Sequence, residues 1–526
     1  MDMTGSATLA DVFDRACHGS PEKEFIVFED RQGAVETFTY AQAAAAVEHY
    51  VAVFARHGIT KGERVLVHMH NRPAYLFTWF ACAKLGAIMV PLNVHAGDFE
   101  LDYCIEYAGA AVVVTEPDFF ARFETLRSKH SGLSTIFLSG ALPEHEYPGA
   151  VLIDEERDCC LHVCKQAALS DTDDLMWLFT SGTTSRPKAV QLTHANAVFA
   201  GQVGAQWWKV TPQDRHMLVL PLFHVNAQFI SVMPVLTAGA ALIMTETFSA
   251  SRYMEQVRRH RATTASLVAT TLTMILNQPG NDLDACNDLR LVMYAIGLPL
   301  EKLLCFQERF KAPLCELWGM SETLGATTIN PPDGEMRLNC IGVARTGNRV
   351  KIVDDDGRDV PAGTVGELVV QGIPGRTIMK GYYNDPDATA ATIRDGWLYT
   401  GDNAYMDEQG YFYFVDRKKD MIKRAGENVA ACEVEYVISL HPAVKDVAVV
   451  GVPDAVREEA VLAFVVPLPG AHCTEQDIID WCSGKLADFK VPCAVRFVDD
   501  FPRTSLGKVQ KHVLKQRALD ALPGEA

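Results

Sequence analysis

The chain has 526 residues, of which 48% are hydrophobic and 22% are charged, and its formal net charge is −18. This length corresponds to roughly three or four domains, and the composition is that of an ordinary globular protein with a large core. The acidic excess argues against a nucleic-acid-binding surface and gives no reason to expect attraction to anionic membranes. We therefore expect no nucleic-acid partner.

The cysteines indicate a reducing compartment. The 14 Cys are scattered without regular spacing, and the first residues lack the basic-then-apolar layout of a signal peptide. We therefore expect a cytoplasmic protein with free thiols. The one Cys/His group, at Cys159, Cys160, His162 and Cys164, matches no common zinc spacing, so a turn or strand is expected there instead of a metal site.

The longest apolar stretch, 229–244, is interrupted by polar, proline and glycine residues. It is shorter than the roughly 20 apolar residues that a transmembrane helix needs. We expect a buried helix, a turn and a strand there, and no membrane span.

Helical and strand patterns alternate through most of the chain. This alternation predicts parallel sheets covered by helices. In chain order, helices are expected at 41–57, 74–85, 98–107 and 119–127, with strands at 64–69, 87–92 and 111–115. Further along, strands are expected at 175–179, 217–220, 266–268 and 291–294, and helices at 194–206 and 251–260.

The last third of the chain has a different pattern. From about Asn348 it becomes β-rich, with Gly and Asp turns. Beyond Lys418, segments at 433–439, 447–450, 463–466 and 475–486 indicate a compact α+β unit. The predicted fold is therefore α/β: a large N-terminal domain of helix-covered sheets over 1–418, with 348–418 as its β-rich subdomain, and a small α+β C-terminal domain over 419–526.

A loop of small and hydroxylated residues follows the expected strand 175–179. Its backbone N–H groups, hydroxyls and one ammonium could all reach a polyphosphate. No Gly precedes Lys188 and Ala189 follows it, so the loop is a poor match to a Walker loop. The alternative is a solvated loop between two strands. The candidate phosphate-binding residues are Thr180, Ser181, Gly182, Thr183, Thr184 and Lys188.

Two other stretches carry carboxylates that could serve a nucleotide. Trp318, Ser321 and Glu322 lie within five residues, and a carboxylate there could hold Mg²⁺. Asp402 follows an apolar strand and could accept both hydroxyls of a ribose. A solvated Glu and an Asx-turn are the alternatives.

Two basic residues complete the set of candidates. Arg417 ends a strand just before the expected boundary, and Lys508 lies beside Gly507 in a polar loop near the C-terminus. A Lys in such a loop is by itself usually a solvated charge.

These stretches, in this order, resemble the adenylate-forming superfamily of acyl-CoA synthetases, firefly-type luciferases and adenylation domains. The resemblance covers 38–508 and includes Gly86-Ala-Ile-Met-Val-Pro-Leu-Asn93, Pro221-Leu-Phe-His224, Gly381-Tyr-Tyr-Asn384 and 446–454. Within the superfamily the chain is most similar to acyl-CoA ligases, and its motifs at 180–188, 372–378 and 421–429 resemble the carnitine/crotonobetaine–CoA ligase branch.

The resemblance implies an ATP-dependent acid–thiol ligase. A carboxylic acid would be activated as acyl-AMP with pyrophosphate release, and the acyl group would then pass to coenzyme A. ATP, Mg²⁺ and coenzyme A are the implied cofactors. Transfer to a carrier-protein thiol or to a partner enzyme remains an alternative, and so, more remotely, does a non-catalytic adenylate-binding protein.

The resemblance also implies roles for the candidate residues. The loop from Thr180 to Thr184 and Lys188 would hold the β- and γ-phosphates, with Trp318 against the adenine where the family usually has Tyr. Ser321 would contact the α-phosphate, Glu322 would bind Mg²⁺, Asp402 and Arg417 would lie at the ribose, and Lys508 would bridge the carboxylate and the α-phosphate. The implied catalytic residues are Lys508, Glu322 and Ser321.

The small C-terminal domain is implied to be mobile. It would rotate about Lys419, bringing either Lys508 or Gly426 and Asn428 to the active site, where Gly426 lets the thiol arm of coenzyme A pass. Asn428 stands where many members have Arg or Gln, and Ser185 and Ala189 replace common glycines.

The acid-binding positions carried over from the motifs are uncharged. A second charge on the acid would normally need a charged partner. We therefore expect a small apolar or weakly polar monocarboxylic acid, although a trimethylammonium group, as in carnitine, would prefer an aromatic cage or an acidic residue. The expected substrate-binding residues are His224, Val225, Asn226, Ala295, Gly297 and Gly319.

Overall fold

The computed structural model describes residues 5–140, 145–156, 168–180, 187–295, 297–418, 420–424, 427–454, 458–483, 485–503 and 509–520. Contacts divide the chain into two compact units. The first contains Met1–Thr180, Pro187–Arg349 and Val370–Leu398, and the second contains Val350–Val369 and the described residues from Tyr399 onward.

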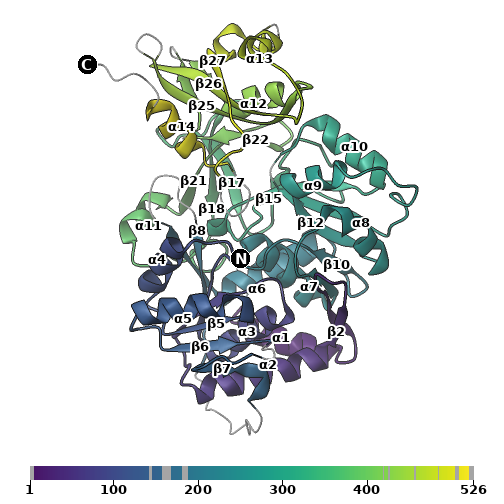
Figure 1. Ribbon diagram of the computed structural model, residues 1–526, viewed down its shortest axis with the longest axis vertical. Helices are drawn as coiled ribbons and strands as arrows, with labels where there is room; N and C mark the ends of the chain where they lie inside the picture. The colour runs from purple at the N-terminus through teal and green to yellow at the C-terminus, as the bar shows by residue number, and fades with distance from the viewer. Residues whose placement is uncertain are drawn as a thin grey trace. The chain divides into compact units, whose positions relative to one another are not determined.

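The first unit contains an eight-stranded sheet in the order β19-β9-β8-β4-β3-β5-β6-β7. Strands β8, β5, β6 and β7 are labelled in Figure 1. The strands from β8 to β7 in this order are parallel, whereas β9 is antiparallel to both β8 and β19. Helices α4 (Asp98–Ala108) and α5 (Phe120–Lys129) share an apolar cluster with one face of this sheet. The strands are β3 (Arg64–His68), β4 (Ile88–Pro91), β5 (Val112–Thr115), β6 (Thr135–Leu138), β7 (Ala150–Leu152), β8 (Asp174–Thr180), β9 (Lys188–Thr193) and β19 (Gly381–Tyr382).

A nine-stranded sheet in the same unit runs in the order β16-β15-β14-β13-β12-β10-β11-β1-β2. Helices α8 (Ala250–Arg259), α9 (Ala269–Leu276) and α10 (Leu300–Phe310) cover one face. The strands are β1 (Glu24–Glu29), β2 (Val35–Thr39), β10 (Arg215–Leu218), β11 (Ala241–Thr245), β12 (Thr264–Val268), β13 (Leu291–Ala295), β14 (Leu314–Trp318), β15 (Thr328–Ile329) and β16 (Val343–Ala344).

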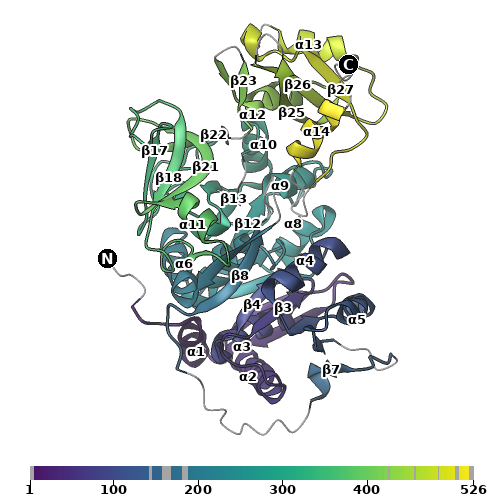
Figure 2. The same ribbon diagram turned by 90° about the vertical axis from the view of Figure 1, so that its left-hand side faces the viewer.

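A layer of helices joins the two sheets of the first unit. Helix α3 contacts β3 and β4, α7 contacts β11, and α1 contacts both of these helices. Helices α1 and α3 lie side by side in Figure 2. Helix α3 is buried nearly all round, as expected for a central helix, with Pro73 in its first turn and a left-handed Gly86 at its end. The helices of this layer are α1 (Leu9–Gly19), α2 (Tyr40–Arg56), α3 (Pro73–Leu85), α6 (His194–Trp207) and α7 (Met233–Ala238).

The β-rich part of the chain forms a five-stranded sheet in the order β17-β18-β21-β20, with β22 paired to β21. The antiparallel pair β21 and β22 places Asp402 opposite Arg417. The elements are β17 (Arg349–Val353), β18 (Gly366–Gln371), α11 (Pro386–Thr392), β20 (Ile393–Arg394), β21 (Trp397–Met406) and β22 (Phe412–Arg417).

The C-terminal part of the second unit is built on another five-stranded sheet, in the order β24-β23-β26-β25 with β27 paired to β26. Helices α12 (Ala431–Ser439) and α13 (Glu475–Cys482) share one apolar cluster with the sheet, and α14 (Lys511–Asp520) shares a second cluster with alternate residues of β25 and β26. The strands are β23 (Ile422–Arg424), β24 (Glu427–Val429), β25 (Val444–Asp454), β26 (Glu458–Pro467) and β27 (Ala494–Phe497).

The expected α/β fold is confirmed, and most predicted elements lie within one or two residues of their observed positions. The strand expected at 217–220 is Arg215–Leu218, and the helix expected at 475–486 ends at Cys482. The stretch 229–244 forms a π-helix (Asn226–Val232), α7 and β11, as the pattern of a buried helix, turn and strand indicated. In the part of the chain that the structure describes, no helix is both long enough and apolar enough to cross a membrane.

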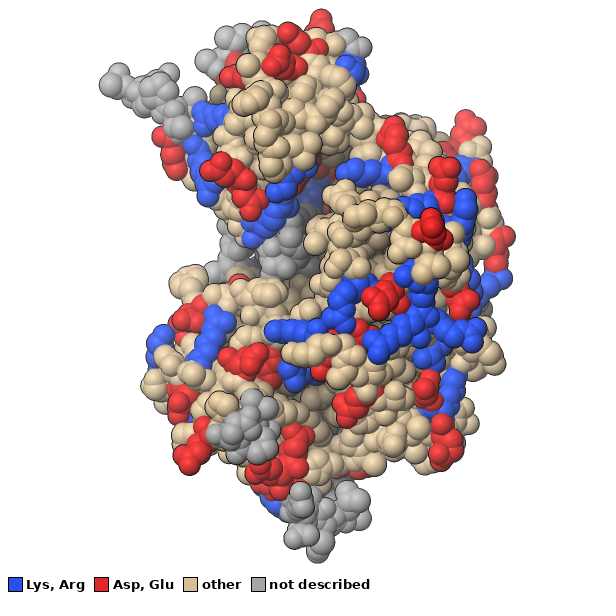
Figure 3. Space-filling model, turned by 45° about the vertical axis from the view of Figure 1, so that its right-hand side comes forward, with Lys and Arg blue, Asp and Glu red and all other residues tan. Residues whose placement is uncertain are grey.

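Charged side chains of both signs are interspersed over the face drawn in Figure 3. Several arginines of the first unit are paired with carboxylates: Arg290 lies 2.7 Å from Asp214, and Arg309 lies 2.7 Å from Asp284. Basic side chains gather across the middle of the face in Figure 3, with acidic side chains among them.

Candidate active site

Most of the candidate residues of the first unit follow strands of the nine-stranded sheet. Strands β10, β12, β13 and β14 are adjacent and parallel, so their carboxyl ends meet at one edge. In open α/β sheets, ligands bind outside that edge. The strand order therefore brings together the segments that carry His224, Ala295, Gly297, Gly319 and Glu322.

Glu322 is held by a contact from a distant strand. It lies in a short 3₁₀ turn, Ser321–Thr323, and is 5% exposed. The Tyr382 hydroxyl donates a hydrogen bond of 2.8 Å to Glu322 Oε1, and the Met379 N–H donates to the Glu322 carbonyl oxygen at 2.8 Å. Burial, together with the nearby Glu322 charge, raises the pKa of Tyr382, so the hydroxyl keeps its proton.

Lys188 lies over the same tyrosine. Its Nζ is 4.9 Å from the centre of the Tyr382 ring, within the range of a cation–π contact. Tyr382 therefore contacts both Lys188 and Glu322, two residues that the sequence predicted for the site. The sequence analysis gave Tyr382 itself no role. The available signal was the motif Gly381-Tyr-Tyr-Asn384, to which no role had been given.

The ends of the candidate phosphate loop are paired. Thr180 and Lys188 are opposite residues of the antiparallel strands β8 and β9, and Thr180 Oγ1 donates to the Lys188 carbonyl oxygen at 3.4 Å. Strands flank this loop on both sides, whereas a Walker loop leads into a helix. Ser181, Gly182, Thr183 and Thr184 lie outside the described residues.

Trp318 ends β14 and is 8% exposed. Glu316, two residues earlier, shares its face of the strand. The Tyr294 hydroxyl donates to Glu316 Oε2 at 2.8 Å. Burial raises the pKa of Glu316 to about 7, although the hydrogen bonds from Tyr294 and from the Cys340 backbone act to lower it. Glu316 Oε1 would be 3.5 Å from a Cβ placed on Gly297.

Sequence reasoning missed Glu316. Its position two residues before Trp318 was visible in the sequence, but its burial and its tyrosine partner depend on the pairing of β13 with β14. A buried carboxyl group beside an aromatic side chain can accept a hydrogen bond from a ligand N–H.

His224 precedes the π-helix and is held neutral. Burial lowers the pKa of His224 to about 3, and its Nε2 has no hydrogen-bond partner among the described residues. Next to it, Asn226 Oδ1 accepts a hydrogen bond of 2.8 Å from the hydroxyl of Ser266, in the middle of β12. π-helical turns often occur at functional sites. This segment carries His224, Val225 and Asn226 to the edge of the sheet.

Gly319 has a structural reason to be glycine. A Cβ at this position would be 2.3 Å from the carbonyl oxygen of Gly325, which is itself left-handed at φ +88°. Gly325 also packs against Val225, whose Cγ2 would be 3.5 Å from a Cβ on Gly325. The close approach of two backbone segments therefore explains Gly319 without a ligand.

Asp402 and Arg417 form a pair in the second unit. They are directly opposite in β21 and β22, and Arg417 Nε is 3.6 Å from Asp402 Oδ1. Asp402 is 9% exposed, and its N–H donates to Thr400 Oγ1 at 3.1 Å. This pair offers a carboxylate acceptor with an adjacent cation, which suits vicinal hydroxyl groups.

The remaining candidates are less fully described. Asn428 lies in β24, where its backbone pairs with Lys423. Lys419, Gly426 and Lys508 lie outside the described residues. So do the Cys/His positions Cys159, Cys160, His162 and Cys164.

The donor set fits a magnesium ion that arrives with a nucleotide. Among the described residues, no group of three or more His, Cys, Asp or Glu side chains could enclose a metal ion. Mg²⁺ is usually held by one or two carboxylates together with substrate phosphates and water. Glu322, a single buried carboxylate near Lys188, meets that requirement.

Comparison with known proteins gives consistent matches over the whole chain. The AMP-binding enzyme family matches residues 13–383, and the AMP-binding enzyme C-terminal domain matches 433–508. A crotonobetaine/carnitine–CoA ligase of Salmonella paratyphi B is 37% identical over 98% of this chain and 100% of its own length.

Two solved structures of CoA ligases are also similar to nearly the whole chain. An anthranilate CoA ligase, AuaEII, in complex with anthranoyl-AMP matches with a TM-score of 0.87 and 25% identity over 98% of each chain. O-succinylbenzoate CoA synthetase from Bacillus subtilis, in complex with ATP and a magnesium ion, matches with a TM-score of 0.81 and 26% identity over 96% of this chain and 99% of that one.

Proposed function

Because the chain belongs to the AMP-binding enzyme family and is an acyl-CoA synthetase that uses ATP, Mg²⁺ and coenzyme A, we propose that its substrate is a small monocarboxylic acid with no second charge. The enzyme activates a carboxylic acid as acyl-AMP with release of pyrophosphate and transfers the acyl group to coenzyme A. A non-catalytic adenylate-binding protein is therefore no longer a competing description. We place the enzyme in the cytoplasm.

The observation that carries this proposal is the absence of charge at the candidate acid-binding positions. Val225, Asn226 and Ala295 are uncharged by nature, and burial keeps His224 neutral. The buried carboxyl of Glu316 lies on the Trp318 face of β14, whereas Leu317 packs with Ile230 on the other face. A second charge on the acid that is buried beside Val225, Asn226 or Ala295 would therefore lack a partner, which costs several kcal/mol.

A second candidate substrate is a carnitine-type acid. The 37% identical relative is named for crotonobetaine and carnitine, and the match covers 98% of this chain. Such an acid carries a trimethylammonium group, which needs aromatic or acidic neighbours. The two candidate substrates differ in one property, the trimethylammonium cation. A pair of acids that differ only in this cation therefore distinguishes the two proposals.

Four of the candidate residues would contact the nucleoside part of ATP. In the first unit, the Trp318 indole would stack on the adenine and Glu316 would accept a hydrogen bond from its exocyclic amino group. In the second unit, Asp402 would take the ribose hydroxyls, with Arg417 beside them. These contacts fix the position of ATP and leave the reacting phosphate to other residues.

The phosphates would be bound by the hairpin loop and the 3₁₀ turn. Lys188, with Thr180 to Thr184, would hold the β- and γ-phosphates, and Ser321 would contact the α-phosphate. Glu322 would hold Mg²⁺, which would supply positive charge to screen the attacking carboxylate from the polyanion. The protein contributes mainly positioning and preorganised charge.

The two half-reactions would use two poses of the C-terminal domain. Rotation about Lys419 would deliver Lys508 to the carboxylate and α-phosphate for adenylation. The other pose would bring Gly426 and Asn428 to the path of coenzyme A. No observation favours a carrier protein or a partner ligase as the acceptor, and the product analysis below tests that alternative.

The test is pyrophosphate release with a panel of acids, followed by mass spectrometry with coenzyme A present. Crotonobetaine and 5,5-dimethylhex-2-enoate have the same shape, because a tert-butyl group replaces the trimethylammonium group. We expect kcat/KM to be about 100-fold higher for the neutral acid, since burying an unpaired cation costs about 3 kcal/mol or more.

Malonate, a dicarboxylate, serves as a second charged comparison and should be a poor substrate. Preference for crotonobetaine over its neutral analogue would overturn the proposed substrate class in favour of a carnitine-type acid. Pyrophosphate release without any acyl-CoA would show that another thiol is the acceptor.

A further inference from the structure

Tyr382 touches two groups of the proposed phosphate site at once. Its hydroxyl donates to Glu322 Oε1 at 2.8 Å, and its ring lies 4.9 Å from Lys188 Nζ. The side chain is 8% exposed. No other described side chain contacts both Lys188 and Glu322 in the hydrogen bonds and cation–π contacts of this structure.

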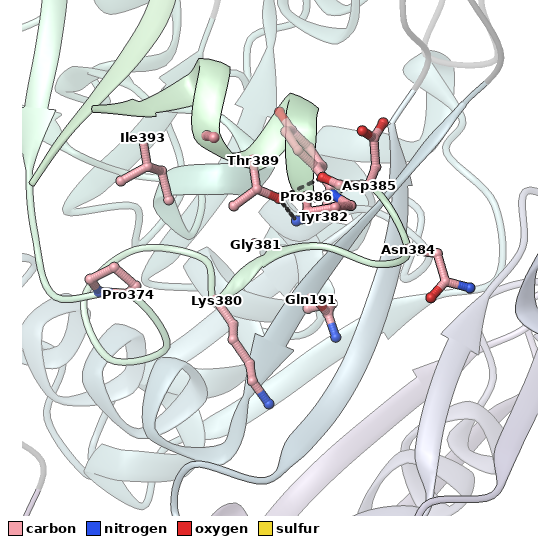
Figure 4. Close-up of a pocket in the computed structure, with 11 residues that line it drawn as sticks. Gln191, Pro374, Lys380, Gly381, Tyr382, Asn384, Asp385, Pro386, Thr389 and Ile393 are labelled. Atoms are coloured by element: carbon pink, nitrogen blue, oxygen red, sulfur yellow. Dashed lines mark hydrogen bonds between the residues drawn. The ribbon is translucent and has the colours of Figure 1, made fainter. Parts of the chain in front are cut away.

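The backbone of Tyr382 is also fixed. Strand β19 pairs antiparallel with β9, with Tyr382 opposite Val190, and the Tyr382 N–H donates to Thr389 Oγ1 at 2.9 Å (Figure 4). Figure 4 shows this backbone at the wall of a cavity of about 560 Å³, between Gly381 and α11. Because β9 begins at Lys188, the same strand pairing sets the positions of the ring and of the ammonium.

We propose that Tyr382 is the positioning residue of the metal-binding carboxylate: its hydroxyl orients Glu322 toward Mg²⁺ while its ring face holds Lys188 beside it. This inference rests on the proposed role of Glu322 as the magnesium ligand. It adds a residue to which neither the sequence motifs nor the comparisons gave a function.

The physical argument starts from the carboxylate. A hydroxyl proton on Oε1 directs the cation toward the other oxygen and so favours one-oxygen coordination. Mg²⁺ is small and requires near-ideal octahedral geometry, whereas Ca²⁺ accepts two-oxygen carboxylate coordination at longer distances. Groups that hydrogen-bond a metal ligand typically change metal affinity or activity 10–100-fold when they are removed.

The contact with Lys188 acts on the nucleotide. A lysine ammonium over an aromatic face is attracted by the ring and loses freedom of motion. Lys188 is then held near the end of the loop that is proposed to bind the β- and γ-phosphates. Tyr382 thereby sets the separation of the lysine and the metal-binding carboxylate before ATP arrives.

The main test is Tyr382→Phe, which removes the hydroxyl and keeps the ring. Mn²⁺ is titrated against the full-length protein and α,β-methylene-ATP, and bound metal is read by electron paramagnetic resonance. We expect binding to weaken 10–100-fold. In pyrophosphate release, the half-saturating Mg²⁺ concentration should rise by the same factor, and inhibition by Ca²⁺ should strengthen.

The matched control is Tyr383→Phe. Tyr383 is the next residue, its ring stacks on Trp177 at 3.8 Å, and its carbonyl oxygen accepts the Tyr107 hydroxyl. It makes no contact with Glu322 in the described structure. Both variants should keep the wild-type melting temperature within a few degrees, and Tyr383→Phe should keep wild-type Mn²⁺ binding.

Glu322→Gln separates failure of the inference from failure of its premise. If Glu322→Gln leaves Mn²⁺ binding unchanged, Glu322 is not the metal ligand. The proposed roles of Glu322 and of Tyr382 are then both overturned. If Glu322→Gln abolishes binding but Tyr382→Phe has no effect, only the role of Tyr382 is overturned. Adding Tyr382→Phe to Glu322→Gln should cause no further loss, because the hydroxyl acts through the carboxylate.

Discussion

At the scale of single residues, Glu316 shows how burial sets the charge of a site. It is 4% exposed, accepts a hydrogen bond from Tyr294, and has a pKa raised to about 7, compared with an ordinary value of 4.5. Between these two values the folded protein holds the Glu316 proton and the unfolded chain releases it. Folding stability therefore falls as pH rises through this window.

Glu316→Gln should remove this pH dependence. The wild-type protein is expected to lose up to about 3 kcal/mol between pH 4.5 and pH 8, at about 1.4 kcal/mol for each pH unit between the two pKa values. The Glu316→Gln variant should lose less folding stability over the same pH range. Urea unfolding at pH 5 and pH 8 measures the difference, with Glu124→Gln as a control because Glu124 is 46% exposed. Parallel pH curves for the wild type and Glu316→Gln would contradict the raised pKa.

At the scale of elements, close helix packing positions the π-helix that carries Asn226. Helix α6 contacts both the π-helix and α7. A Cβ at Gly201 of α6 would be 2.3 Å from Thr237 Oγ1 and 3.0 Å from the Met233 carbonyl oxygen. Helical periodicity predicted α6 correctly, but the reason for a glycine in its interior became visible only in the packing.

Gly201→Ala should therefore destabilise the protein. Alanine favours a helix by about 1 kcal/mol over glycine, but overpacking at a tight contact typically costs about 1–3 kcal/mol. We expect a net loss of up to about 2 kcal/mol in the free energy of unfolding, measured with urea. Adding Thr237→Ala to Gly201→Ala should recover part of the lost stability, because it removes one of the two groups that the new Cβ would meet. The other group, the Met233 carbonyl oxygen, remains. A more stable Gly201→Ala protein would refute this account of the helix contact.

At the scale of the whole molecule, the proposed rotation about Lys419 has a local cost. Asp416 in β22 accepts a hydrogen bond of 3.1 Å from the Cys432 N–H, in the first turn of α12. A carboxylate there satisfies a helix N–H that has no partner within the helix. Because Asp416 and Cys432 lie on opposite sides of Lys419, a rotation about that residue would have to break this bond.

If the C-terminal domain works in two poses, Lys508 should serve only the adenylation half-reaction. Lys508→Ala should lower adenylation about 10²–10³-fold, the usual cost of removing a preorganised charge. Conversion of supplied acyl-AMP to thioester should stay near the wild-type rate. The two half-reactions are measured separately by pyrophosphate release and by acyl-CoA formation. Lys515→Ala is the control, because Lys515 pairs with Glu459 on a partly exposed surface. Equal loss of both half-reactions in Lys508→Ala would refute the two-pose proposal.

The sequence by itself determined the fold class and many of the helices and strands that build it. Apolar periodicity is a local property, so the helices α2 and α6 and the strands β3 and β13 were predicted close to their observed bounds. The ordered motifs also identified the family, because several short patterns in one order rarely occur by chance. Helices α1, α9, α10, α11 and α14 were not predicted, and the strand expected at 217–220 was displaced by two residues.

Only the tertiary structure decided how the candidate residues are supported. Tyr382 meets Glu322 across 60 positions of sequence, through the pairing of β19 with β9. Glu316 meets Tyr294 through the register of β13 and β14. Strand order and register depend on contacts between distant segments, which local periodicity does not encode. The sequence thus named the groups that can bind a nucleotide, and the packing of the strands assigned the residues that hold them in place.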